Sequence, residues 1–96
     1  MCHGTVGLLN VKLSDGKNLV DGRAITSFSD AEEEAVSLTE AMPFALETEL
    51  KGRGAKYSKA AEDWGSHVVT DGRIVTGQNP ASATAMAEAV LKAIAA

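Results

Sequence analysis

Strand-like and helix-like segments alternate along this chain, and their order constrains the fold more than any other feature of the sequence. Apolar and β-branched residues predict strands within residues 19–28, 55–60, 67–70 and 73–76. Asp71-Gly72 joins the last two segments as a hairpin turn, because both residue types tolerate a positive φ. Asp15-Gly16 and Asp21-Gly22 predict two further turns. This alternation indicates an α/β fold in which at least two helices cover the faces of a small mixed sheet.

The first long helix signal follows Phe28. Ser29 with Glu32 three residues later has the form of a capping box, which predicts a helix that starts near Asp30. Four apolar residues then recur every four positions: Leu38, Met42, Leu46 and Leu50. This spacing predicts that helical structure continues to Gly52, with Pro43 kinking or restarting the helix.

Helix signals also mark both ends of the chain. Residues 5–11 are typical of a short helix, which the turn after Ser14 interrupts. Near the other end, Asn79 is a candidate N-cap and Pro80 suits the first helical position. The helix that follows presents one apolar face: Ala83, Met86, Ala87, Val90, Leu91 and Ile94. We expect this face to lie against a sheet or a partner.

Size and charge exclude several classes of function. The 96 residues suffice for one domain. Nine Lys and Arg against 13 Asp and Glu give a net charge of −4, which offers no electrostatic footprint for nucleic acid or for an anionic membrane surface. The sequence shows no signal peptide and no apolar run of bilayer length, so the expected location is the cytoplasm. The single cysteine forms no intramolecular disulfide.

The first four residues, Met1-Cys2-His3-Gly4, carry the clearest chemical signal. A nucleophilic thiol needs a depressed pKa, which a helix N-terminus or an adjacent imidazole supplies. Cys2 stands on a turn that leads into the helix at 5–11, and Gly4 lets the backbone turn sharply, as at a nucleophile elbow. On spacing alone, the alternative is a flexible chain terminus with no role.

The other histidine and the metal hypothesis carry less weight. His67 begins a strand and is interpreted as a surface or packed histidine in preference to a pocket-rim residue. Cys2, His3 and His67 do not form a closely spaced set of zinc ligands, so we expect no metal site.

Several motifs together carry a resemblance to a known superfamily. They are Cys2-His3-Gly4, Leu8-Leu9, Asp15-Gly16, Ile25-Thr26, Phe28, Asp30-Ala31-Glu32-Glu33-Glu34, Asp71-Gly72-Arg73 and Thr76-Gly77-Gln78-Asn79-Pro80-Ala81-Ser82. Over essentially its whole length the chain resembles the C-terminal half of the ThiJ/PfpI superfamily. It is most similar to the branch of heat-shock chaperones with glutathione-independent glyoxalase (glyoxalase III) activity.

The resemblance implies a partial flavodoxin-like, class I glutamine amidotransferase-like sandwich, with residues 1–96 forming the C-terminal portion of one ThiJ/PfpI domain. It implies a nucleophile at Cys2, the triad histidine at His3 and the acid at Glu33, with Glu32 or Glu34 in its place if the register is off by one. The implied reaction converts methylglyoxal to lactate and needs no metal or organic cofactor.

Two departures from the superfamily pattern bear on function. Thr5 stands where the superfamily usually has proline, and Met1 replaces the last residue of the strand that carries the nucleophile. The superfamily's N-terminal half, with its oxyanion-hole segment and a glutamate beside the nucleophile, has no counterpart here. We therefore expect a fragment, a split-gene product or a mispredicted start.

Two classes of function stay open from the sequence. The first is an enzyme of the glyoxalase III or deglycase type, with a cysteine peptidase or amidase as its chemical neighbour. The second is a non-catalytic, chaperone-like or binding module. The expected partners are a small aldehyde or glycated substrate and either further copies of the chain or the missing N-terminal half, because an incompletely covered core favours association.

Overall fold

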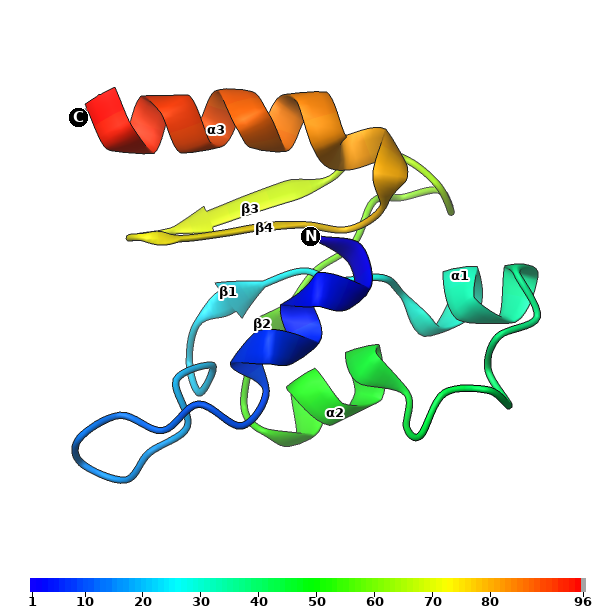
Figure 1. Ribbon diagram of the computed structural model, residues 1–96, viewed down its shortest axis with the longest axis horizontal. Coiled ribbons are helices and arrows are strands. Elements are labelled where there is room, and N and C mark those ends of the chain that lie inside the picture. The colour runs from blue at the N-terminus through cyan, green and yellow to red at the C-terminus, as the bar shows by residue number, and fades with distance from the viewer. Residues whose placement is uncertain (96) are drawn as a thin grey trace.

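The computed structural model describes residues 1–95, and its helices and strands alternate as the sequence predicts (Figure 1). The helical elements are η1 (Cys2–Leu8), α1 (Asp30–Ala35), α2 (Leu46–Gly52), η2 (Pro80–Ser82) and α3 (Ala83–Ala95), where η denotes a 3-10 helix. The strands are β1 (Ala24–Ile25), β2 (Lys56–Tyr57), β3 (Val68–Asp71) and β4 (Ile74–Gly77).

The strands form two pairs. β1 and β2 are parallel, and β3 and β4 form the predicted antiparallel hairpin, in which Val68 pairs with Gly77 and Asp71 with Ile74. Gly72 in the turn has a φ of 60°, a conformation that glycine adopts without strain. Side chains connect the two pairs, because the Ala24 N–H donates to Asp71 Oδ2 (2.8 Å) and the Thr26 N–H donates to Thr76 Oγ1 (3.0 Å).

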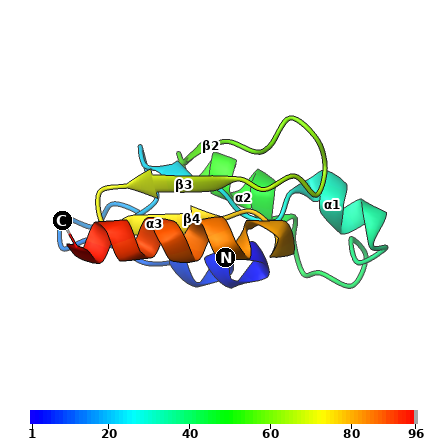
Figure 2. The same cartoon turned by 90° about the horizontal axis from the view of Figure 1, so that it is seen from above.

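The helices lie on different sides of the strands. In Figure 1, α3 runs along the hairpin at the top and α2 lies below β1 and β2. Figure 2 shows α3 following the hairpin lengthwise. The buried apolar core lies between η1, β1 and α2 and comprises Leu9, Val20, Ile25, Leu46 and Leu50. No residue of α3 is buried, so its apolar face stays largely open.

The predicted helix across residues 30–52 is wrong in its middle. α1 ends at Ala35, because Ser37 takes a left-handed backbone conformation (φ 58°) and the Leu38 N–H turns back to the Glu33 carbonyl (3.1 Å). The chain re-enters a helix only at Leu46. Of the four apolar residues spaced four apart, Leu46 and Leu50 reach the core, whereas Leu38 is 41% exposed.

The boundaries of other elements also differ from those predicted. The helix expected at residues 5–11 is a 3-10 helix that already starts at Cys2, and the strand expected within 19–28 is regular only at Ala24–Ile25. The capping box is confirmed: Ser29 Oγ accepts the Glu32 N–H, and Glu32 Oε1 accepts the Ser29 N–H, both at 3.1 Å. Asn79 precedes η2, but its side chain caps nothing there, because it is used elsewhere.

Candidate active site

The backbone at Cys2 has the geometry expected of an elbow. Cys2 has a φ of 55°, one of three positive values at non-glycine residues between positions 1 and 95. Such a conformation costs about 1–3 kcal/mol and persists only where surrounding contacts hold it. Two hydrogen bonds do so here: the Gly4 N–H donates to the Met1 carbonyl (2.9 Å) and the Phe28 N–H to the Cys2 carbonyl (3.4 Å).

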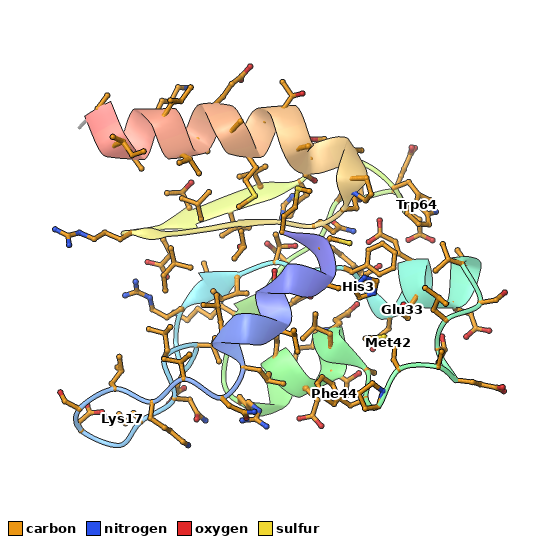
Figure 3. The ribbon with its side chains drawn as sticks, in the orientation of Figure 1. His3, Lys17, Glu33, Met42, Phe44 and Trp64 are labelled. Carbon is orange, nitrogen blue, oxygen red and sulfur yellow. The ribbon has the colours of Figure 1, made fainter. Side chains whose placement is uncertain are left out.

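His3 connects Cys2 to α1. Its Nδ1 lies 3.7 Å from Cys2 Sγ, and its Nε2 lies 2.7 Å from Glu33 Oε2 (Figure 3). An ionised carboxylate only accepts hydrogen bonds, so Glu33 favours the tautomer with its proton on Nε2. Nδ1 then faces the sulfur with a free lone pair. His3 is therefore placed to accept the thiol proton.

The thiol itself is not activated in the resting state. Burial raises the pKa of Cys2 most, the hydrogen bond from the His3 backbone N–H lowers it, and the carboxylates of Glu32 and Glu33 raise it further. The net pKa lies above the usual value, which differs from the depressed pKa that the adjacent imidazole and helix suggest. The main reason is burial of the thiol, to which the negative charges of Glu32 and Glu33 add, and the His3 backbone N–H and the positive N-terminus do not offset these effects.

Three consecutive glutamates at the start of α1 have three different environments. Glu33 has a side chain only 8% exposed and is the one that contacts His3. Glu34 is exposed and accepts a hydrogen bond from Thr39 Oγ1 (2.8 Å). Glu32 is fully buried and does not bond to His3. Of the three candidates for the acid, the structure therefore brings only Glu33 to His3.

Glu32 is the centre of a buried polar network. Its Oε1 accepts from Ser29 N, Ser29 Oγ and Gln78 Nε2, at 3.1, 3.1 and 2.9 Å. Its Oε2 accepts from Trp64 N at 2.9 Å and from Asn79 Nδ2 at 2.7 Å. Burial raises the pKa of Glu32, but the hydrogen bonds from Gln78, Asn79, Ser29 and Trp64 outweigh burial and hold the pKa below its ordinary value.

Aromatic rings extend from His3 toward the loop at residues 58–66. The Phe28 ring lies 4.5 Å from the His3 ring and 5.4 Å from the Trp64 ring, which it meets edge to face. Trp64 is 40% exposed and has a φ of 66°. Sequence reasoning missed Phe28 and Trp64 as parts of the site, because only folding brings residues so far apart in the chain together.

A cavity of about 240 Å³ opens beside Glu33. Its lining comes from α1, the following loop and the start of α2: Asp30, Glu33, Glu34, Thr39, Met42, Phe44 and Ala45. Figure 3 shows Glu33 between His3 and Met42. Across residues 1–95, no three His, Cys, Asp or Glu side chains gather as a set that fits a metal ion.

His67 lies apart from this site. Its ring Nε2 is 2.9 Å from Ser58 Oγ, and its backbone N–H donates to Ser82 Oγ (3.0 Å). These partners are those of a packed histidine. Among the described residues, no helix is long and apolar enough to cross a membrane.

Comparison with curated proteins gives several relatives. The chain is 37% identical over 101 residues to a probable glutathione-independent glyoxalase of Schizosaccharomyces pombe, covering 98% of this chain and 39% of that protein. It is 36% identical over 98 residues to Glyoxalase 3 of Candida albicans, covering 97% of this chain and 42% of that protein. No protein-family model matches the chain. The chain thus spans about two-fifths of the length of these relatives.

Solved structures show the same fold. The Rapid Encystment Protein 24 kDa of Francisella tularensis superposes with a TM-score of 0.91 at 47% identity, over 96% of this chain and 40% of that chain. Glyoxalase III of Candida albicans gives a TM-score of 0.87 at 36% identity, over 96% of this chain and 41% of that chain.

Fold and sequence together define the class as that of ThiJ/PfpI superfamily proteins, with the α/β architecture of a flavodoxin-like fragment. The match extends over nearly the whole chain and falls on the C-terminal part of the relatives. Within the superfamily, the chain is homologous to the C-terminal part of the glutathione-independent glyoxalases (glyoxalase III).

Proposed function

We propose that this chain supplies the nucleophile, the base and the acid of a glutathione-independent glyoxalase that converts methylglyoxal to lactate. Cys2 is the nucleophile, His3 the base and Glu33 the acid that orients it. The observation that carries the proposal is the position of His3, whose two ring nitrogens lie 3.7 Å from the Cys2 sulfur and 2.7 Å from the Glu33 carboxylate. A nucleophile, a base and a group that orients the base are what covalent catalysis requires.

The first step forms a carbon–sulfur bond. Because the pKa of Cys2 is raised, the thiol is protonated before substrate binds. His3 Nδ1 takes the thiol proton as the sulfur adds to the aldehyde carbon, and it then gives this proton to the former aldehyde oxygen, which becomes the hydroxyl of a hemithioacetal. Glu33 stabilises the imidazolium that forms for that moment.

The second step moves a hydrogen between the two carbons of the substrate. His3 removes the proton from the former aldehyde carbon, an enediol forms, and the proton returns to the neighbouring carbon. The product is a thioester of lactate. Water then hydrolyses it and restores the thiol. One carbon is oxidised while its neighbour is reduced, so the reaction balances with water alone and needs no external electron acceptor.

The test is lactate formation from methylglyoxal. It uses the chain alone and the chain together with the N-terminal part of a relative, because we propose that residues 1–96 form the C-terminal portion of a single domain. Cys2→Ala and His3→Ala should abolish turnover, whereas Glu34→Gln should leave it unchanged. Absence of lactate formation in the reconstituted protein would show that the enzyme assignment is wrong.

A second candidate function is a binding module without catalysis. The observation that favours it is the open face of α3, where Leu91 is 67% and Ile94 76% exposed. Light scattering checks whether this face drives association of further copies or of the N-terminal part. We propose the cytoplasm as the place of action, because a free thiol persists in a reducing compartment.

A further inference from the structure

Trp64 combines three properties that a loop residue with only a structural role does not need. Its backbone is left-handed, which is strained for a bulky side chain. Its backbone N–H donates to the buried carboxylate of Glu32 at 2.9 Å. The residue as a whole, in contrast, stays 40% exposed. The protein thus fixes the backbone of this residue and presents its side chain to solvent.

One ring, that of Phe28, lies between the Trp64 indole and the imidazole of the Cys2–His3–Glu33 site. The indole contacts the Phe28 ring edge to face at 5.4 Å, and the Phe28 ring contacts the His3 ring at 4.5 Å. The Phe28 N–H also donates to the Cys2 carbonyl. Trp64 is therefore linked to the catalytic imidazole through the ring of Phe28, which is buried (4% exposed), and Trp64 is the exposed member of this aromatic pair.

The hydrogen bonds around Glu32 fix the orientation of the two amide side chains that donate to its carboxylate. Asn79 Nδ2 also donates to the Gly65 carbonyl (2.8 Å), and Gln78 Oε1 accepts the Ala60 N–H (2.8 Å). Neither amide can flip without losing a bond to the backbone. Both amides consequently present their NH₂ groups to Glu32, and an acceptor with two ionised oxygens satisfies them together with the Trp64 N–H.

We infer that Trp64 is a specificity-determining residue that forms an aromatic wall of the site and favours electrophiles carrying a flat apolar substituent, and that Glu32 is its positioning residue. This inference rests on the proposed function, because it takes Cys2 as the nucleophile. Glu32 acts through the Trp64 backbone and the adjoining Gly65, so it is not a catalytic residue.

The experiment measures alkylation of Cys2, the only cysteine of the chain, by iodoacetamide and by N-benzyl iodoacetamide. The ratio of the two rate constants in the folded chain is divided by the same ratio in urea, which removes the intrinsic difference between the reagents. An aromatic contact corresponds to a preference of roughly 2- to 12-fold for the benzyl reagent. Trp64→Ala should reduce this preference to about 1. A Trp64→Ala variant that keeps the parent's preference for the benzyl reagent would refute the assignment of Trp64 as a wall of the site.

Glu32→Gln tests the positioning. It should lose the same preference and shift the emission of Trp64, the only tryptophan, toward that of the unfolded chain. Glu34→Gln is the matched control and should behave as the parent. If folded Glu32→Gln keeps both the preference and the emission, Glu32 does not position Trp64.

If Glu32→Gln fails to fold, hydrogen exchange of the parent chain tests the positioning of Trp64 instead. The Trp64 amide should exchange its hydrogen as slowly as the amides of α1, and exchange at the unprotected rate would refute the positioning. None of these readouts needs turnover. Failure to form lactate would therefore refute the proposed function and leave this inference to be judged by alkylation.

Discussion

Replacing Glu32 by glutamine changes one oxygen of a buried carboxylate into an NH₂ group. The two oxygens are not equivalent, because Oε1 accepts from Ser29 and Gln78 while Oε2 accepts from Trp64 and Asn79. An NH₂ group in place of Oε1 faces three donors and one in place of Oε2 faces two, so at least two donors lose their acceptor. The side chain retains the shape of glutamate, so the loss is one of hydrogen bonding and charge.

The magnitude follows from the donors that lose their acceptor. Each buried donor left unsatisfied costs about 1–3 kcal/mol, so two of them cost about 2–6 kcal/mol. A chain of this length has a free energy of unfolding of about 5–14 kcal/mol at the usual value per residue. Glu32→Gln should therefore remove a large share of the stability and leave a marginally folded protein.

Urea unfolding followed by circular dichroism measures this loss. The matched control is Glu34→Gln, which changes an exposed carboxylate of the same helix and should leave the free energy of unfolding nearly unchanged. Glu32→Gln with the parent's free energy of unfolding would refute the network as a source of stability.

The pH dependence gives an independent check on the parent chain. The folded state holds the pKa of Glu32 below its ordinary value of 4.5. A lowered folded-state pKa contributes stability above the unfolded pKa, and this contribution is lost as the pH falls through the folded pKa. Stability should therefore decline below about pH 4.5 in the parent, and this decline should be weaker in Glu32→Gln. Equal declines in the stability of the parent and of Glu32→Gln would contradict the assignment of this pH dependence to Glu32.

Three further predictions concern other residues. Glu33→Gln should lower kcat for methylglyoxal by roughly 10²- to 10⁴-fold in the reconstituted protein, because the amide no longer fixes the tautomer of His3; kcat equal to that of the parent would contradict the assignment. The pH midpoint of Cys2 alkylation should lie higher in the folded chain than in the unfolded chain, because folding raises the pKa of the thiol. For the same reason, the free energy of unfolding should fall as the pH rises through that midpoint. A midpoint at or below that of the unfolded chain would show an activated thiol. Gly54→Ala should destabilise the chain by more than about 1 kcal/mol in urea unfolding, because Gly54 has a φ of 91° and a Cβ there would meet the Asp21 carboxylate. Gly52→Ala is the control, since its Cβ meets nothing within 4 Å. Equal stabilities of the two variants would be inconsistent with this strain.

The sequence predicted the features that depend on neighbouring residues. The capping box at Ser29 and the hairpin around Asp71-Gly72 are local, and both are present. The apolar spacing from Leu38 to Leu50 was misleading, because periodicity shows which residues share a face only if one helix is continuous. The left-handed turn at Ser37 breaks that continuity, and serine carries no strong signal for it.

The site was predictable in part. Cys2 and His3 are adjacent in the chain, so their contact needs little folding, whereas Glu33 came from the resemblance to the superfamily and not from local rules. The Glu32 network was not predictable, because its partners Gln78 and Asn79 are 46 and 47 residues away. Local rules interpret Asn79 as a helix cap, and the tertiary structure uses its amide to bind a carboxylate.

The side-chain hydrogen bonds between β1 and the hairpin have a consequence for aggregation. β2 pairs with one edge of β1 through backbone groups, and the N–H groups of Ala24 and Thr26 point to the other edge. Asp71 and Thr76 occupy those donors, so no further strand is needed to satisfy them. A strand of a second molecule can add at this edge only by displacing both side chains, which protects β1 from templated pairing.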